Sequence, residues 1–187
     1  MNMRNCFAHS ARLLTRTRSL TLAAMLIALN VALSSVRVQI TPELRLSLGF
    51  ITQASSGMLL GPVCAMLTGA ASDILSHICF PTGAYFPGYT LTAVVGGLIY
   101  GVFLFERPRP NYLRALLVKG VMSLVCNIGL NTLWISLTGG QAMLALLPAR
   151  LIKNLCLLPI EALLIYMTAA ALTVALRRSG LMRGARD

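Results

Sequence analysis

Residues 147–176 read LPARLIKNLCLLPIEALLIYMTAAALTVAL, a long apolar run that carries two basic residues and an asparagine near its start. Arg150, Lys153 and Asn154 share one helical face, because residues three and four apart are neighbours on a helix. A charge inside a bilayer costs about 2.5–3.5 kcal/mol on insertion scales, so such a group usually faces a ligand or a partner. The stretch therefore predicts an anion-binding wall near the outer end of a bundle of membrane helices.

The composition of the whole chain also predicts a membrane protein. Of its 187 residues, 57% are hydrophobic and 11% are charged, and the mean hydropathy is +0.77. A soluble domain carries about 25% charged residues, so this chain has too few polar side chains to cover a surface exposed to water. Because backbone groups in lipid must be hydrogen-bonded internally, we expect an all-α integral membrane protein.

Six apolar segments predict a six-transmembrane-helix bundle. Several approach the roughly 20 residues that span a bilayer, whereas the second and third are short. Gly61–Pro62 separates those two and is typical of a tight turn. The segments are Leu20–Val36, Leu46–Leu60, Val63–Ile78, Tyr89–Leu104, Leu113–Leu137 and Leu144–Leu176.

The basic residues predict the orientation of this bundle. Most of the 16 lie in residues 1–19, in residues 107–114 or after residue 176, and the positive-inside rule places these parts in the cytoplasm. We therefore expect a basic, disordered cytoplasmic arm at 1–19, one membrane domain at 20–177 and a basic cytoplasmic tail at 178–187. This distribution argues against nucleic-acid binding, which a pI near 10.4 alone would suggest. Arg37 and Arg45, in an expected external link, are the exceptions and invite a functional interpretation.

Several polar side chains interrupt the apolar segments. Asp73, Asn131 and Trp134 lie toward the expected external ends of their segments. Lys119 lies near the inner end of the fifth segment, where we expect it to snorkel to the cytoplasmic face. Glu161 is the deepest charge in the sixth segment, and a protonated or hydrogen-bonded packing role is favoured over a ligand role.

Two further patterns leave alternatives open. Residues 80–90 read FPTGAYFPGYT, and their aromatic rings are either an interfacial belt or a stacking surface for a planar ligand with an acidic tail. Ala24, Ala28 and Ala32 recur at intervals of four, which permits close approach of another helix. Periodicity alone favours internal packing for these alanines. Gly97 and Gly101 form a similar pair, which we also interpret as packing.

Other functional classes lack their motifs. The five cysteines form no C-x-x-C pair and have no histidine at ligand spacing, so we expect neither a metal site nor a cofactor. An intramembrane serine protease needs G-x-S-G, whereas residues 54–57 read ASSG and no histidine lies in the last three segments. A secondary transporter usually shows internal repeats, and none is evident. The chain has no G-x-x-x-x-G-K-[ST] motif, so energy for transport must come from other chains.

Five segments together carry a resemblance to a known family. They are TLAAMLIALNVALS at 21–34, FPTGAYFPGYTLTA at 80–93, GLIYGVF at 97–103, LNTLWISL at 130–137 and LPARLIKNLCLLPIE at 147–161. Over about Leu20 to Leu176 the chain resembles the folate-specific S components (FolT) of energy-coupling factor (ECF) transporters. The resemblance implies a six-helix subunit, not itself an enzyme, that captures folate outside a bacterial cell membrane.

The resemblance also implies partners. The subunit would dock on a transmembrane coupling protein, EcfT, driven by two cytoplasmic ATPases, and topple in the membrane to release its cargo. Ala24 and Ala28 match the family's Ala-x-x-x-Ala docking motif, which favours a partner interface over internal packing. The alternatives are an S component for another vitamin with a planar ring and an acid group, and a membrane-embedded enzyme.

The motif match implies a set of substrate-binding residues, and the chemistry of folate suggests their roles. The aromatic members stack on the pterin, and the asparagines orient it. Asp73 accepts hydrogen bonds from the pterin edge, while Arg150 and Lys153 pair with the two carboxylates and Arg45 closes over them. The expected residues are Arg45, Asp73, Phe80, Tyr85, Phe86, Asn131, Trp134, Arg150, Lys153 and Asn154.

Overall fold

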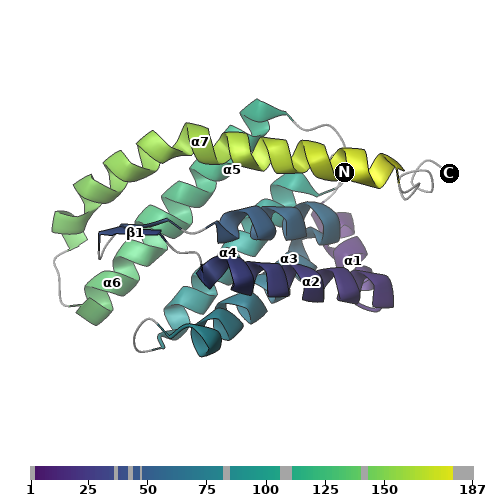
Figure 1. Cartoon of the computed structure of the whole chain (residues 1–187), viewed down its shortest axis with the longest axis horizontal. Coiled ribbons are helices and arrows are strands. Elements are labelled where there is room, and N and C mark those ends of the chain that lie inside the picture. The colour runs from purple at the N-terminus through teal and green to yellow at the C-terminus, as the bar shows by residue number, and fades with distance from the viewer. Residues whose placement is uncertain are drawn as a thin grey trace.

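The structure, a computed structural model, is a helical bundle with one short hairpin (Figure 1). It describes residues 3–35, 38–41, 44–46, 48–81, 85–105, 111–139 and 143–178. The elements are α1 (Met3–Leu13), α2 (Thr17–Ser35), β1 (Val38–Thr41), β2 (Leu44–Leu46), α3 (Gly49–Cys79), α4 (Pro87–Leu104), α5 (Tyr112–Met122), the π-helix η1 (Ser123–Leu130), α6 (Asn131–Gly139) and α7 (Met143–Arg178).

Five stretches of the described chain are long and apolar enough to cross a membrane. The expectation of an all-helical membrane protein is confirmed, apart from the small antiparallel β1–β2 hairpin within the link that was expected at residues 37–45. The stretches are Thr17–Ser35, Gly49–Cys79, Pro87–Leu104, Tyr112–Thr138 and Asn154–Ala175.

The chain reverses direction inside α3, as the Gly61–Pro62 pair predicted. Gly61 has φ 79°, a left-handed conformation that glycine adopts without steric cost. The hydroxyl oxygens of Ser56 and Thr68, 12 residues apart, lie within hydrogen-bonding distance at 2.6 Å. A straight helix would separate such residues by about 18 Å, so the two halves of α3 must run side by side.

Glycines allow α4 to lie directly against the second half of α3. A β-carbon on Gly97 would come within 2.3 Å of the Ala65 carbonyl oxygen, and one on Gly101 within 2.3 Å of Pro62 Cα. These contacts are backbone to backbone, which only a residue without a side chain permits. The interpretation of Gly97 and Gly101 as packing residues is confirmed, and we call this contact the glycine seam.

Residues 3–13 form a helix, so the expectation of a disordered arm is wrong there. Ser10 is fully buried against the reversal of α3: its hydroxyl donates to the Leu60 carbonyl at 2.8 Å and accepts from the Val63 and Cys64 N–H groups. The first N–H groups of a helix have no partner within the helix. Ser10 supplies that partner after the turn, which sequence periodicity does not reveal.

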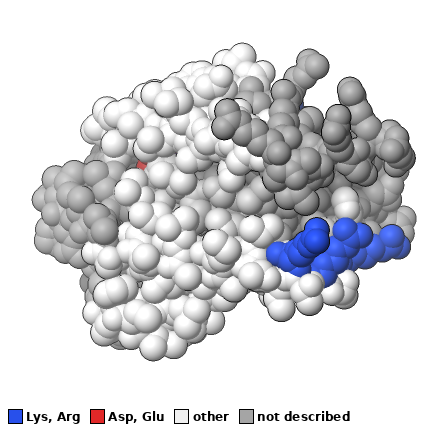
Figure 2. Space-filling view, turned by 45° about the vertical axis from the view of Figure 1, so that its right-hand side comes forward, with Lys and Arg blue, Asp and Glu red and all other residues white. Residues whose placement is uncertain are grey.

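The described surface is almost entirely uncharged outside the N-terminal region. Figure 2 shows basic side chains gathered at one end of the molecule, and Arg12, Arg16 and Arg18 are exposed there. Large apolar side chains face outward elsewhere, among them Leu124 at 67% and Leu155 at 69% exposure. Such an apolar exterior suits lipid rather than water.

Lys119 does not snorkel, which corrects the sequence-based prediction. Its Nζ lies 3.0 Å from Glu161 Oε2, with the two side chains 4% and 15% exposed, and 4.3 Å from the centroid of the Phe50 ring. A buried ammonium group needs a partner of opposite charge, and Glu161 supplies it from the facing helix. Glu161 thus has the hydrogen-bonded packing role that was favoured for it.

Candidate functional site

The first part of the candidate site is a chain of hydrogen bonds that joins α3 to α4. Thr90 Oγ1 donates to Asp73 Oδ2 at 2.7 Å, and the Tyr85 hydroxyl lies 2.7 Å from the same threonine oxygen. Because Thr90 gives its proton to the carboxylate, the Tyr85 hydroxyl is the donor in the second contact. The ring of His77 lies 5.2 Å from that of Tyr85. A half-buried acid is thereby held beside an exposed aromatic ring.

The second part is a group of aromatic rings between α4 and α6. The Phe86 ring lies 5.5 Å from that of Trp134 and 6.0 Å from that of Tyr89. Trp134 Nε1 donates to Thr92 Oγ1 at 3.0 Å, and Thr92 in turn donates to the Gly88 carbonyl at 3.0 Å. These bonds fix the indole orientation, so α4 presents Thr90 toward α3 and Thr92 toward α6.

Gly88 is needed for this arrangement because the rings close over it. A β-carbon there would lie 2.3 Å from Phe86 Cε1 and 2.6 Å from Trp134 Cδ2. Distances below 3 Å require a neighbour to move. Position 88 therefore lets the two rings approach the first turn of α4.

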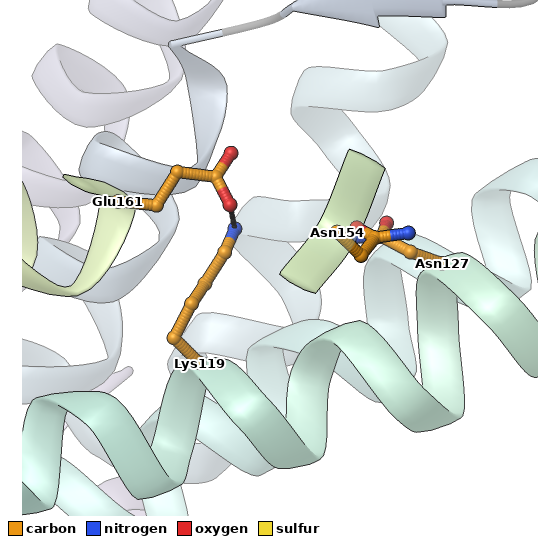
Figure 3. Close-up of polar contacts among 4 residues, drawn as sticks. All are labelled: Lys119, Asn127, Asn154 and Glu161. Atoms are coloured by element: carbon orange, nitrogen blue, oxygen red, sulfur yellow. Dashed lines mark hydrogen bonds and ion pairs between the residues drawn. The ribbon is translucent and has the colours of Figure 1, made fainter. Parts of the chain in front are cut away.

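The third part lies between η1 and α7, where two amides meet. Asn127 Nδ2 donates to Asn154 Oδ1 at 3.2 Å (Figure 3). Arg150 and Lys153 belong to the same stretch of α7, and Arg45 belongs to β2, where it pairs with Gln39. The side chains of these three basic residues lie outside the part of the chain that the structure describes.

The structure thus brings together some of the predicted residues. Asp73 shares a hydrogen-bonded chain with Tyr85, Phe86 contacts Trp134, and Asn154 is held by η1. Two predicted residues lie apart from these contacts in the described part of the chain. Phe80 follows α3 and is 40% exposed, and Asn131 is half-buried at the start of α6.

Four contributors were missed by sequence reasoning: Gly88, Thr90, Thr92 and Asn127. Three of them lie within residues 80–93, where the sequence-based prediction used the aromatic rings and not the hydroxyl groups between them. A threonine in an apolar helix usually bonds to its own backbone, so nothing in the sequence distinguishes Thr90 and Thr92 from such residues. Asn127 is a second amide, beside Asn131, in the apolar segment 113–137, and a half-buried amide there predicts a hydrogen-bond partner.

The helix α2 exposes the alanines that sequence spacing singled out. Ala24, Ala28 and Ala32 are all exposed. On another face of α2, Asn30 Nδ2 donates to Thr52 Oγ1 at 2.5 Å and to the Gly49 carbonyl at 3.2 Å, which ties the helix to α3. The small residues are therefore not buried within the described chain, and the prediction of internal packing from periodicity alone is wrong.

Comparison with known proteins gives consistent matches along the chain. The family model for the substrate-specific component of ECF transporters matches residues 18–169. A folate transporter FolT from Clostridium novyi is 44% identical over 126 residues, covering 67% of this chain and 73% of that protein. One from Leuconostoc mesenteroides is 35% identical over 150 residues, covering 78% and 80%.

A solved structure gives the same result in three dimensions. The crystal structure of FolT bound with folic acid is similar with a TM-score of 0.77 and 33% sequence identity. The likeness covers 83% of this chain and 95% of that one.

Proposed function

The chain belongs to the family of ECF-transporter substrate-specific components, and from that premise we propose that it captures folate outside the cell for import. The observation that carries the proposal is the likeness to a folic-acid-bound FolT over most of both chains. In this role the protein binds substrate, while partner ATPases supply the energy. A related vitamin with a planar ring and an acid group is the second candidate, because the same fold would serve it.

The described contacts support a stacking site for the pterin. The Phe86 and Trp134 rings, with centroids 5.5 Å apart and planes tilted by 56°, each offer an apolar face, and the indole is held by Thr92. Asp73 bonds to Thr90 through one carboxylate oxygen, and its other oxygen has the acceptor capacity that the pterin amino and ring N–H groups require. Tyr85 adds a further exposed ring, whose hydroxyl bonds to Thr90.

The acidic tail of folate would meet the basic positions of α7. Arg150 and Lys153 precede Asn154 within about one helical turn, and Asn154 is already fixed by its contact with η1. A guanidinium group binds a carboxylate bidentately, which suits the glutamate part of folate. Arg45, in the β1–β2 hairpin, is assigned to closing the site, and Phe80 and Asn131 complete the predicted set.

For the arrangement in the membrane we propose six spanning segments with both termini in the cytoplasm. The reversal at Gly61 supports this proposal, because it divides α3, one of the five candidate stretches, into two antiparallel halves. In Figure 1, α1 and the end of α7 lie at one end of the bundle, and β1, α6 and the start of α7 lie at the other. The exposed arginines at the α1 end suit the cytoplasmic side of a bacterial plasma membrane.

The exposed alanines of α2 are assigned to docking on the coupling protein EcfT, which would carry two cytoplasmic ATPases. Small side chains at Ala24 and Ala28 leave room for a partner helix to approach closely. The described chain itself places no helix against them. The described part of the proposed arm, which includes α1, and the end of α7 lie at the end of the bundle where the ATPases would be.

Calorimetric titration of the purified chain in detergent tests this function. Folate, reduced folates, riboflavin, biotin and thiamine would each be added to the unmodified protein and to an Arg150→Ala variant. We expect saturable binding of folates and weakened binding by the variant, since it removes a partner of the carboxylates. Binding of another vitamin would keep the family and overturn the substrate, and unchanged affinity in the variant would overturn the carboxylate assignment.

A further inference from the structure

Two polar contacts join the α5–η1 helix to α7 like rungs of a ladder (Figure 3). Lys119 pairs with Glu161 at 3.0 Å, and Asn127 donates to Asn154 at 3.2 Å. Lys119 precedes Asn127 in the chain, whereas its partner Glu161 follows Asn154, so the two helices are antiparallel. The ion pair forms an inner rung, and the amide pair forms an outer rung next to the proposed substrate site.

The spacing of the rungs differs between the two helices. Glu161 follows Asn154 by seven residues, whereas Asn127 follows Lys119 by eight. Seven residues of α-helix return to within about 20° of the starting face, but eight overshoot by about 80°. In a regular helix Asn127 would therefore point away from α7 when Lys119 pointed toward it.

The π-helix η1 (Ser123–Leu130) removes this mismatch. Its i→i+5 hydrogen bonds give wider turns, which accommodate one extra residue. The residues after it are therefore not rotated by the additional angle of about 100° that one more residue adds in an α-helix. Asn127 then lies within about 20° of the Lys119 face, as the contact with Asn154 requires. The spacing from Lys119 to Asn127 exceeds that from Asn154 to Glu161 by one residue, and η1 accommodates this one residue.

We propose that Asn127 is a positioning residue of the substrate site, directed at α7 by η1. Its amide donates to the side-chain oxygen of Asn154 and thereby orients that amide and the adjoining basic positions 150 and 153. This inference rests on the proposed function, because it assigns the ordering of these positions to binding of the folate glutamate. Asn127 itself acts through Asn154 and makes no contact with substrate in this account.

A double-mutant cycle on affinity tests the proposal. Asn127→Leu, Asn154→Leu and the double variant would be titrated with folate and with pteroic acid, which lacks the glutamate. We expect Asn127→Leu to weaken folate binding about five- to tenfold, as loss of one half-buried hydrogen bond implies, and pteroic acid binding much less. The double variant should bind folate no more weakly than Asn154→Leu alone. Leu124→Ala, at an exposed position of η1, is the matched control and should change neither affinity.

Several outcomes of this cycle would overturn the proposal. Equal weakening of folate and pteroic acid would show a general packing role, and additive losses would show that Asn127 does not act through Asn154. If the unmodified protein binds folate and the Asn127→Leu variant binds it with the same affinity, this inference is wrong and the proposed function still holds. Absence of folate binding by the unmodified, folded protein would remove both.

The role of η1 has its own test, which changes the number of residues. Deletion of Leu124 leaves a spacing of seven between Lys119 and Asn127, so a regular α-helix keeps both rungs and folate binding should persist. Insertion of one alanine after Leu124 rotates Asn127 by about 100° away from α7, and we expect loss of folate binding. A folded deletion variant without folate binding, or an insertion variant with normal binding, would contradict the proposed register. Melting of each variant without ligand establishes that it is folded.

Discussion

Small residues at helical spacing occur in two regions of this molecule, and their surroundings are opposite. In the glycine seam, Gly97 and Gly101 lie against the backbone of α3. In α2, Ala24 and Ala28 are exposed, with no helix of the described chain against them. The difference teaches that such spacing predicts a close helix contact without saying whether the partner lies in the same chain. The seam belongs to a packed body of α3, α4, α5 and α7, whereas the exposed face of α2 is available to another protein.

The largest effect is expected from the inner rung of the packed body. Lys119→Met leaves the Glu161 carboxyl group buried without its cationic partner, which should cost about 3–5 kcal/mol of unfolding free energy. Thermal unfolding in detergent measures the loss. The double variant Lys119→Met/Glu161→Leu is the control and should recover most of the stability, because it removes both charges. A single variant as stable as the unmodified protein would contradict the importance of this pair.

The glycine seam should give the next largest effect. Gly97→Ala places a methyl group 2.3 Å from a backbone carbonyl oxygen that has no flexible end to move, so we expect a loss of about 1–3 kcal/mol. The control is Gly120→Ala, where the nearest side-chain atom lies 3.8 Å away and the change should be neutral or slightly stabilising. Equal melting temperatures for the two variants would show that the seam is not tightly packed.

A smaller effect is expected where the packed body supports the candidate site. Thr92→Val keeps the shape of the side chain and removes the acceptor for Trp134 Nε1, which should cost about 1 kcal/mol. The fluorescence of this single tryptophan should change, and folate affinity should fall, because the indole loses its fixed orientation. Thr168→Val, at a half-buried position whose hydroxyl bonds to its own helix, serves as the control. An unchanged tryptophan spectrum would argue against the Thr92 contact.

The smallest effect on stability, together with a large effect on function, is expected in α2. Ala24→Leu and Ala28→Leu change exposed positions, so stability should stay within about 0.5 kcal/mol. Folate binding by the isolated chain should also be unchanged, whereas folate uptake by cells that supply the coupling module should be lost. Met25→Ala, at a neighbouring exposed residue, is the control for uptake. Normal uptake by both leucine variants would contradict the docking role.

The sequence predicted those features that depend on composition and on local geometry. Apolar runs located the membrane helices, and Gly61–Pro62 marked the reversal, because both follow from a few neighbouring residues. Partners distant in sequence were not accessible in this way. The snorkelling prediction for Lys119 was wrong because its partner Glu161 lies on another helix, and the buried role of Ser10 depends on α1 folding back onto α3.

The same distinction holds in the candidate site, where residue types were predictable and distant partners were not. The aromatic rings and charged residues were found from their residue types, because such side chains are unusual in apolar segments. The threonines that position Asp73 and Trp134 were not found, since a hydroxyl in a helix reveals nothing of its partner on a neighbouring helix. The extra residue in η1 could not be predicted either, because it is recognised only when the Lys119–Asn127 spacing is compared with the Asn154–Glu161 spacing of α7.

Titration of Trp134 fluorescence with folate tests the central claim most directly, because the chain has a single tryptophan and it lies in the candidate site. The purified chain alone, in detergent, should show a saturable change with folate that riboflavin, biotin and thiamine do not produce. The Ala24→Leu/Ala28→Leu variant should give the same curve, because docking and binding use different surfaces. A folded protein whose tryptophan fluorescence does not respond to folate, or responds to one of the other vitamins instead, would contradict the account.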